Sequence, residues 1–257
     1  MYKRQLQGTE GREKYKVYGE LINTYGYNLE PGSKELTALN YYTNEEITIP
    51  LDPTQTPGEN AQRYFAKYNK QKRTFEALTE LIQETADDIQ YLESISNALD
   101  IALSEADLAQ IKEELMQSGY IRRKHTKKKV KLTSKPMHYI SSDGYDMYVG
   151  KNNLQNEELT FSFANGNDWW FHAKGAPGSH VIVKSGGDEL PDRTFEEAGR
   201  LAAYYSKNRG ADKVEIDYIQ KKHVKKPNGA KPGFVVYYTN YSLVIDSDIS
   251  NIKNVQD

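Results

Sequence analysis

The chain has 257 residues, with 34 Lys and Arg, 36 Asp and Glu, 20 Tyr and no Cys. The absence of Cys excludes disulfide-stapled secreted modules, thiolate metal sites and a cysteine nucleophile, and it fits a reducing compartment. No apolar run is long enough for a transmembrane helix or for the core of a signal peptide, and 37% hydrophobic residues exclude a broadly disordered chain.

The net charge of −2 hides an asymmetry along the chain. Residues 1–120 carry 12 basic and 20 acidic side chains, whereas residues 121–257 carry 22 basic and 16 acidic ones. The local net charges are therefore −8 and +6. This difference predicts two parts with different roles, of which the second can meet a polyanion.

The first predicted element is a helix over residues 13–25 with one apolar face. It starts near the first residue without a clear cap, so we expect residues 1–25 to be the end of a first coiled-coil arm in a longer chain. A small module at residues 26–60 follows, with short strands predicted at 36–43 and 46–51 around a tight turn.

Residues 61–99 show the clearest periodicity in the chain, with steps of three and four residues. Nine of the twelve positions in this register are apolar, which is typical of a coiled-coil helix. An isolated helix cannot bury such a stripe, so its partner is either the helix at 13–25, folded back antiparallel, or a second chain. The twelve positions are Ala61, Tyr64, Tyr68, Gln71, Phe75, Leu78, Ile82, Thr85, Ile89, Leu92, Ser96 and Leu99.

The second coiled-coil arm is predicted to extend to residue 119. Ser104 and Asp107 have the spacing of a capping box, and Gly119 suits a helix C-terminus. The face formed by Leu108, Ile111 and Leu115 is expected to be buried. The carboxylate pairs Asp87-Asp88 and Glu113-Glu114 are interpreted as solvated helix faces.

Residues 120–136 form a basic linker, and residues 137–257 are predicted to be a compact α+β domain. One helix is expected between the strands, with Thr194 and Glu197 as its capping box and an end at Gly210. Alternating apolar residues predict strands around 145–149, 159–163, 181–183, 214–216, 235–237 and 243–245.

Two basic segments are candidates for binding nucleic acid. Like charges this dense repel one another and are stabilised by phosphates, although a charge run alone, such as the first segment, is more often a solvated flexible hinge. Together the segments predict an electrostatic surface that follows an RNA backbone. The first segment holds Arg122, Arg123, Lys124, Lys127, Lys128, Lys129 and Lys131, and the second holds Lys221, Lys222, Lys225, Lys226 and Lys231.

A third candidate is the segment NDWWFHAKGAPGSH at residues 167–180. Strand alternation directs Asp168, Trp170 and His172 to one face and Trp169 and Phe171 to the other. One interpretation is a surface on which a base or ribose stacks. The other is a hairpin core, in which His172 and His180 bond to turn backbone.

Catalysis and metal binding have little support in the sequence. The two histidines of the third candidate lie eight residues apart without a Cys, and no HExxH, GxSxG or Walker motif is present. The pair Gly186-Gly187 precedes acidic residues, which would repel phosphate. We therefore expect no catalytic residue, no metal site and no cofactor.

Three motifs together resemble the NFACT family, whose bacterial members are also called fibronectin-binding protein A. They are NDWWFHAKGAPGSHVIVK, EEAGRLAAYYSKNRG and VKKPNGAKPGFVVYYTN, in the family's order and spacing. Upstream, GELINTYGYNLEPG and IPLDPTQTPGENAQRYFAKYNKQKR resemble the family's middle module and second coiled-coil arm. The resemblance transfers an RNA-binding role to the basic group at 225–231 and to Asp168, Trp170, His172, Lys174, Gly178, Ser179 and His180.

The resemblance implies a cytoplasmic scaffold of ribosome-associated quality control. Bacterial members bind the large ribosomal subunit with its rRNA and peptidyl-tRNA, and they recruit alanyl-tRNA for C-terminal alanine tailing. Peptide-bond chemistry stays with the ribosome, so the protein is expected not to be an enzyme, and neither DNA nor a membrane is an expected partner. The family's N-terminal domain has no counterpart in the motifs, which implies a C-terminal fragment.

Two other functions remain as alternatives. The older family name suggests a surface adhesin that binds fibronectin, although no secretion signal precedes the first helix. A nucleic-acid-processing enzyme would use His172 and His180. Loss of turnover on His172→Ala, with RNA binding intact, would favour the enzyme.

Overall fold

The computed structural model describes residues 2–122 and 134–255. Its contacts divide the chain into an N-terminal unit, residues 1–88, and a C-terminal unit, residues 89–257. The helix α3 (Pro57–Ile101) runs through the boundary. Both units contain helices and strands, which confirms the predicted α+β class. Within the described residues, no helix is both long and apolar enough to cross a membrane.

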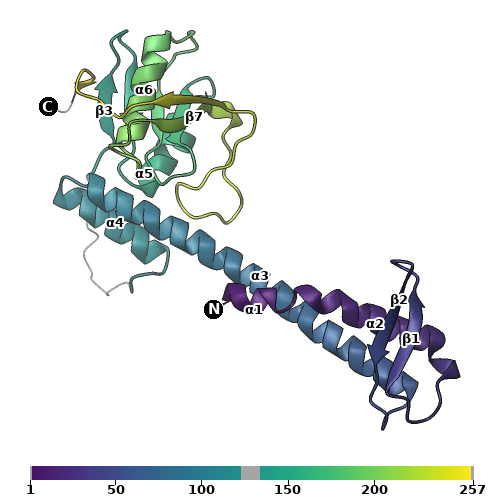
Figure 1. The fold of residues 1–257 in the computed structure, drawn as a ribbon. Helices are drawn as coiled ribbons and strands as arrows, with labels where there is room; N and C mark the ends of the chain where they lie inside the picture. Colours follow the sequence, from purple (N-terminus) through teal and green to yellow (C-terminus); the bar gives the residue numbers. More distant parts are fainter. Residues whose placement is uncertain (1, 123–133, 256–257) are drawn as a thin grey trace. The chain divides into compact units, whose positions relative to one another are not determined.

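The N-terminal unit is a helix pair with a hairpin at one end (Figure 1). It contains α1 (Tyr2–Gln7), α2 (Glu13–Tyr25), β1 (Glu35–Asn40), β2 (Glu45–Pro50) and the first half of α3. Gly26 of the connection lies against Pro57, Gly19 lies against Phe65, and Arg12 stacks on Phe75. The helices are therefore antiparallel and pair within one chain.

The start of α3 is fixed by a capping box that the sequence analysis does not identify. The Thr56 backbone N–H donates to Glu59 at 2.7 Å, and the Glu59 N–H donates back to the Thr56 hydroxyl at 3.3 Å. Pro57 occupies the first helical position, where a missing N–H costs nothing. The helix thus begins four residues before the predicted arm.

The predicted heptad register is correct only for the first part of α3. Positions from Ala61 to Ile82 are buried or half-buried, but Ile89, Leu92 and Leu99 are 54%, 42% and 49% exposed. In this second half the buried residues are instead Tyr91, Ile95 and Ala98. The stripe changes face because α3 changes partner, from α2 to α4 (Glu105–Gln117).

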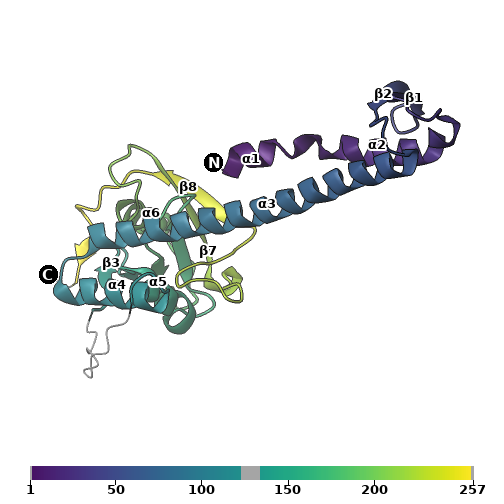
Figure 2. The same cartoon turned by 90° about the horizontal axis from the view of Figure 1, so that it is seen from below.

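The helix α4 packs on α3 within the C-terminal unit, as Figures 1 and 2 both show. Ser104 and Asp107 form the predicted capping box. Ile111 is buried and Leu115 half-buried, as predicted, but Leu108 is 49% exposed. The interpretation of Glu113-Glu114 as a solvated pair is wrong for Glu114, whose side chain is fully buried.

A seven-stranded antiparallel sheet forms the rest of the C-terminal unit, in the order β8-β7-β5-β6-β4-β3-β9. One face packs on α6 (Asp192–Tyr204), and the other packs on α5 (Asn153–Glu158) and the π-helical turn that continues it (Leu159–Phe163). The strands are β3 (Met137–Ile140), β4 (Asp146–Val149), β5 (Trp169–Ala173), β6 (Val181–Val183), β7 (Val214–Gln220), β8 (Tyr241–Ile245) and β9 (Lys253–Asn254).

Four predictions for the sheet and its helices are wrong. The helix α6 ends at Tyr204 and not at Gly210. Residues 159–163 are helical because α5, capped by the Asn152 side chain, continues into them. Residues 235–237 form only one isolated bridge, between Lys225 and Val236. Thr194 and Glu197 do not cap α6, because their side chains bond to the turn at 141–143 instead.

The close approach of α2 to α3 generates a first prediction. A Cβ at Gly19 would lie 2.8–2.9 Å from ring atoms of Phe65. Gly19→Ala should therefore destabilise the N-terminal unit by about 1–3 kcal/mol through overpacking, which exceeds the gain of about 1 kcal/mol from helix propensity. Thermal unfolding followed by far-ultraviolet circular dichroism measures the change.

Gly58→Ala is the matched control, because a Cβ at Gly58 meets no atom within 4 Å. Both tryptophans belong to the C-terminal unit, so tryptophan fluorescence should report the same transition in all three proteins. A higher melting temperature for Gly19→Ala than for Gly58→Ala would contradict the close packing.

Candidate nucleic-acid interface

The second basic segment is held at the end of β7 by backbone hydrogen bonds. The Lys221 N–H donates to the Asp168 carbonyl at 2.8 Å, and the Lys222 N–H donates to the Gly166 carbonyl at 2.9 Å. Val224 then buries its side chain against the sheet, and Lys225 pairs with Val236 through two 2.9 Å backbone bonds. These contacts close residues 221–236 into a loop, called the basic loop below.

The basic loop is anchored at two further points. Glu157 of α5 pairs with Lys226 at 2.7 Å and accepts the Gly233 N–H at 3.3 Å. Gly233 has φ +76°, and a Cβ there would lie 2.9 Å from the side chain of Asn153. Only glycine fits this close approach, so the loop is held against α5.

The five lysines of the segment differ in what their ammonium groups contact. Lys231 donates to the Tyr120 hydroxyl at 2.8 Å and lies 4.6 Å from the centre of the Tyr91 ring. Lys222 and Lys225 are exposed, and their ammonium groups have no ion pair with any residue in the ranges 2–122 and 134–255. These two lysines are therefore the best placed to meet phosphate groups.

Asp168 is a buried structural carboxylate with 1% exposure. It pairs with the Lys184 ammonium and accepts the backbone N–H of Asn165 at 2.7 Å and of Ser185 at 3.2 Å. A buried charge with this many partners is satisfied without a ligand. The structure therefore does not support the predicted contact between Asp168 and RNA.

Trp170 lies in the core on the sheet face away from α6, with 0% exposure. Its ring stacks on His172 at a centroid distance of 5.6 Å and meets His180 edge-on at 5.1 Å. The predicted alternation along β5 is correct, since Phe171 and Trp169 belong to the opposite core. The hairpin-core interpretation of this segment is thus favoured over a stacking surface.

The other motif residues mostly have structural roles. His180 is 2% exposed, and its Nδ1 lies 2.8 Å from the Thr160 hydroxyl, while Ser179 is 1% exposed. A Cβ at Gly178 would lie 3.0 Å from Ser206, so this glycine permits a close approach. Lys174 is exposed but paired with Glu215. RNA binding by Lys174 and by half-buried His172 stays a prediction.

The first basic segment is represented in the structure by its first residue. Arg122 is exposed. The predicted RNA contacts that lie outside the described residues are Arg123, Lys124, Lys127, Lys128 and Lys129.

Two buried carboxylates on α4 connect the helices to residues 134–153, and sequence reasoning missed these contacts, although it placed Asp107 in a capping box. Glu114 accepts from the Asn153 amide at 2.8 Å and from the Tyr91 hydroxyl at 3.0 Å, and burial raises its pKa. Burial alone would raise the pKa of Asp107. Hydrogen bonds from Ser134, Leu103, Ser104 and Lys151 outweigh this effect and lower its pKa to about 2. Neither partner set is visible in sequence, because the partners lie up to 44 residues away.

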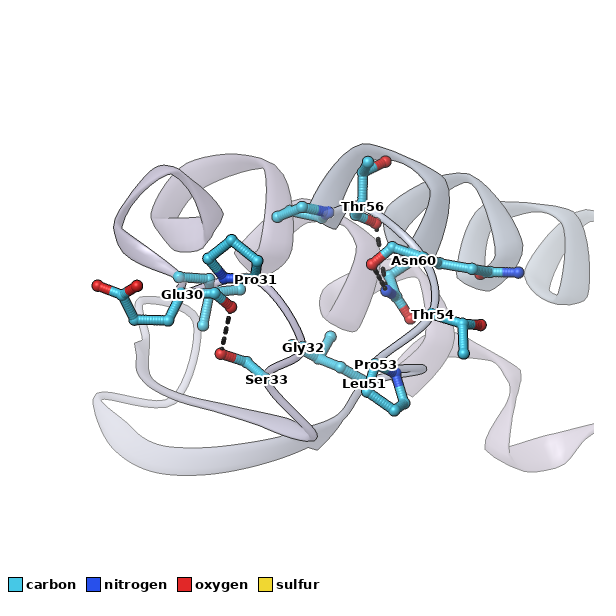
Figure 3. Close-up of a pocket in the computed structure, with 12 residues that line it drawn as sticks. Glu30, Pro31, Gly32, Ser33, Leu51, Pro53, Thr54, Thr56 and Asn60 are labelled. Atoms are coloured by element: carbon cyan, nitrogen blue, oxygen red, sulfur yellow. Dashed lines mark hydrogen bonds between the residues drawn. The ribbon is translucent and has the colours of Figure 1, made fainter.

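A cavity of about 280 Å³ lies in the N-terminal unit, between the turn at 30–33 and the start of α3 (Figure 3). Leu29, Pro31, Leu51 and Pro53 supply much of its apolar lining. The Asn60 amide closes it by donating to the Asp52 carbonyl at 3.1 Å. No Lys or Arg lines the cavity.

Comparison with known proteins covers both units. Residues 1–134 match the model of the NFACT N-terminal and middle domains, and residues 135–238 match that of the NFACT protein RNA-binding domain. The Rqc2 homolog RqcH of Streptococcus pneumoniae R6 is 42% identical over 98% of this chain and 46% of its own length. The Rqc2 homolog RqcH of Bacillus subtilis 168 is 40% identical over 96% of this chain and 44% of its own length.

The chain thus spans about half the length of the curated relatives that it matches. A solved structure has a similar fold over nearly the whole chain. It is the C-terminal of the fibronectin/fibrinogen-binding protein from Streptococcus suis, with 36% identity and a TM-score of 0.69. The match covers 96% of this chain and 88% of that one.

The histidine pair generates a prediction for acid stability. Burial lowers the pKa of His172 to about 4, and burial together with the charge of His172 lowers that of His180. The unfolded chain, with a histidine pKa near 6.5, then binds protons more readily than the folded chain below pH 6.5. Stability should fall by about 2 kcal/mol from His172 alone between pH 7 and pH 5.

Urea unfolding followed by tryptophan fluorescence at pH 7, 6 and 5 measures this effect. His172→Gln removes one titrating ring and should flatten the pH dependence, whatever its own effect on stability. The raised pKa of Glu114 has the opposite effect, because it makes the folded chain more stable as the pH falls. Glu114 is present in both proteins, so the difference between their slopes of unfolding free energy against pH reports the histidine. Equal slopes in the two proteins would contradict the prediction.

Proposed function

The chain belongs to the NFACT family, as its motifs predict, and on this basis we propose that it is an RNA-binding part of a ribosome quality control factor. The observation that supports this most directly is the match of residues 135–238 to the family's RNA-binding domain, combined with two exposed lysines on an anchored loop. This chain is 40–42% identical to the Rqc2 homologs RqcH of three Streptococcus strains and of Bacillus subtilis.

We extend the proposal to specific partners. The C-terminal unit contacts rRNA or tRNA phosphates on the large ribosomal subunit that carries peptidyl-tRNA, in the cytoplasm. The complete protein recruits alanyl-tRNA for C-terminal alanine tailing. The protein acts as a scaffold rather than an enzyme, because the ribosome forms the peptide bonds.

Substitution of Lys222 and Lys225 tests this proposal. Lys222→Gln with Lys225→Gln removes two charges from the basic loop and should weaken binding to large ribosomal subunits on the order of tenfold at 0.1 M salt. The slope of log affinity against log salt should become shallower by about 1–2, since two phosphate contacts are lost. Co-sedimentation with purified subunits over a salt series gives both quantities.

The matched control is Lys213→Gln with Lys253→Gln, which removes two exposed charges outside the basic loop. It should leave the slope unchanged if the basic loop makes the contact. Equal losses in the two variants would refute a localised contact, and absence of salt-dependent binding in the parent chain would refute RNA binding by this chain.

The printed title of the Streptococcus suis structure supports one alternative, a fibronectin-binding protein. Binding of this chain to immobilised fibronectin at physiological salt, without binding to ribosomal subunits, would favour that alternative. The basic-loop variant distinguishes RNA binding from fibronectin binding. Loss of the two lysines is expected to weaken binding to a polyanion such as RNA more than binding to fibronectin.

A further inference from the structure

The helix α6 leaves one end of the sheet uncovered. It begins at Asp192, directly after Pro191, and packs on β5, β7 and β8. On this face Trp169, Tyr218 and Tyr241 occupy the uncovered ends of the three strands. The result is a depression of about 440 Å³, which we call the aromatic-acid pocket.

Four aromatic rings line the pocket and contact one another. Phe195 of α6 meets Trp169 edge-on at a centroid distance of 4.9 Å and lies 5.3 Å from Tyr218. Tyr241 stacks on Tyr218 at 5.5 Å and is 60% exposed. The lining is thus rigid at its base and open at its rim, where a side chain from another molecule can enter.

Three carboxylates surround these rings. Asp188 and Glu189 come from the loop before α6, and Asp192 is the first residue of α6. All three are exposed, and none has an ion pair with a cation in the part of the chain that the structure describes. Burial, Tyr241 and the charge of Asp192 together raise the pKa of Tyr218. The negative charge of Asp192 therefore has an electrostatic effect on the aromatic lining of the pocket.

The loop that carries the carboxylates is built into the fold. Ser185 donates its N–H to Asp168 at 3.2 Å and its hydroxyl to the Asn167 carbonyl at 3.0 Å. Gly186 and Gly187 then turn the chain with φ values of +64° and +99°, which other residues rarely adopt. This accounts for the glycine pair, which phosphate binding does not explain.

The chemistry of the pocket selects a cation. The face of an aromatic ring is electronegative and attracts ammonium or guanidinium groups, and three carboxylates reinforce this preference. A nucleic-acid phosphate would be repelled. Guanidinium fits better than ammonium, because it is planar, stacks on aromatic rings and forms paired hydrogen bonds with a carboxylate.

We propose that the aromatic-acid pocket binds an arginine side chain presented by a basic protein partner. The occupant follows from the charge complementarity and from the open rim, which admits a side chain from a surface. The site is separate from the basic loop and uses the opposite face of the sheet. Its test is therefore independent of RNA binding.

Nuclear magnetic resonance gives a direct readout, because the chain has two tryptophans in different environments. Trp169 lines the pocket, whereas Trp170 is fully buried on the other face. Titration with the peptide acetyl-Gly-Arg-Gly-amide should shift the indole N–H signal of Trp169 in a saturable way in the millimolar range. The signal of Trp170 should stay in place, and Trp169→Phe assigns the two signals.

Two control peptides test the chemistry. The citrulline peptide is nearly isosteric but neutral and should not bind, so an equal shift would overturn the role of charge. The lysine peptide should bind several-fold more weakly, and equal binding would overturn the assignment to guanidinium. A saturable Trp169 shift with a short uridine oligonucleotide would overturn the proposal in favour of a base-stacking site.

Variants test the named residues. Asp188→Asn with Glu189→Gln should weaken binding of the arginine peptide about tenfold or more, and Tyr241→Ala should do the same by removing an exposed ring. Asp212→Asn, an exposed carboxylate outside the pocket, is the control and should bind as the parent does. An unchanged Trp170 signal shows that each variant is folded. Undiminished binding in the first two variants would overturn the proposal.

Discussion

A single buried residue, Asp168, helps to position both surfaces proposed above for the C-terminal unit. Asp168 holds the turn at 165–168 through Asn165, and it holds the loop after β6 through Ser185. Its carbonyl receives the N–H of Lys221, where the basic segment begins. Because an unpaired buried charge would cost several kcal/mol, the turn at 165–168 and the loop after β6 must both be in place for the Asp168 carboxylate to be satisfied. Asp168 therefore contributes to the proposed RNA surface through the backbone that it organises.

The two surfaces have opposite charge and start from the same strand end. Gln220, the last residue of β7, lines the aromatic-acid pocket, and Lys221 follows it directly. The chain then crosses to the other face, where Val224 is buried with Trp170. The sheet and its core thus separate the carboxylates near α6 from the lysines of the basic loop. If both proposals hold, this separation keeps the lysines and the carboxylates from neutralising each other.

Local sequence patterns predict this structure correctly where the burial of a residue depends on one neighbouring element. The alternation along β5 assigns Trp169, Trp170 and Phe171 to their correct faces, and the Ser104 capping box needs only four residues of chain. Prediction fails where a partner changes or lies far away. The heptad pattern continues past Ile82 although α3 exchanges α2 for α4, and Glu114 is charged yet buried by Asn153. The aromatic-acid pocket depends on where α6 begins relative to three strands, which no local pattern encodes.

The middle of α3 has a consequence for how the protein responds to its medium. Residues 83–90 are all exposed, and residues 74–101 contain seven acidic side chains and no basic one. Glu76, Glu80 and Glu84 are exposed and spaced four apart, so neighbours on this row repel by about 0.2–0.5 kcal/mol per pair. Dissolved ions screen that repulsion. Rising ionic strength should therefore stabilise the helical backbone of this segment, and it would at the same time weaken the phosphate contacts proposed for the basic loop.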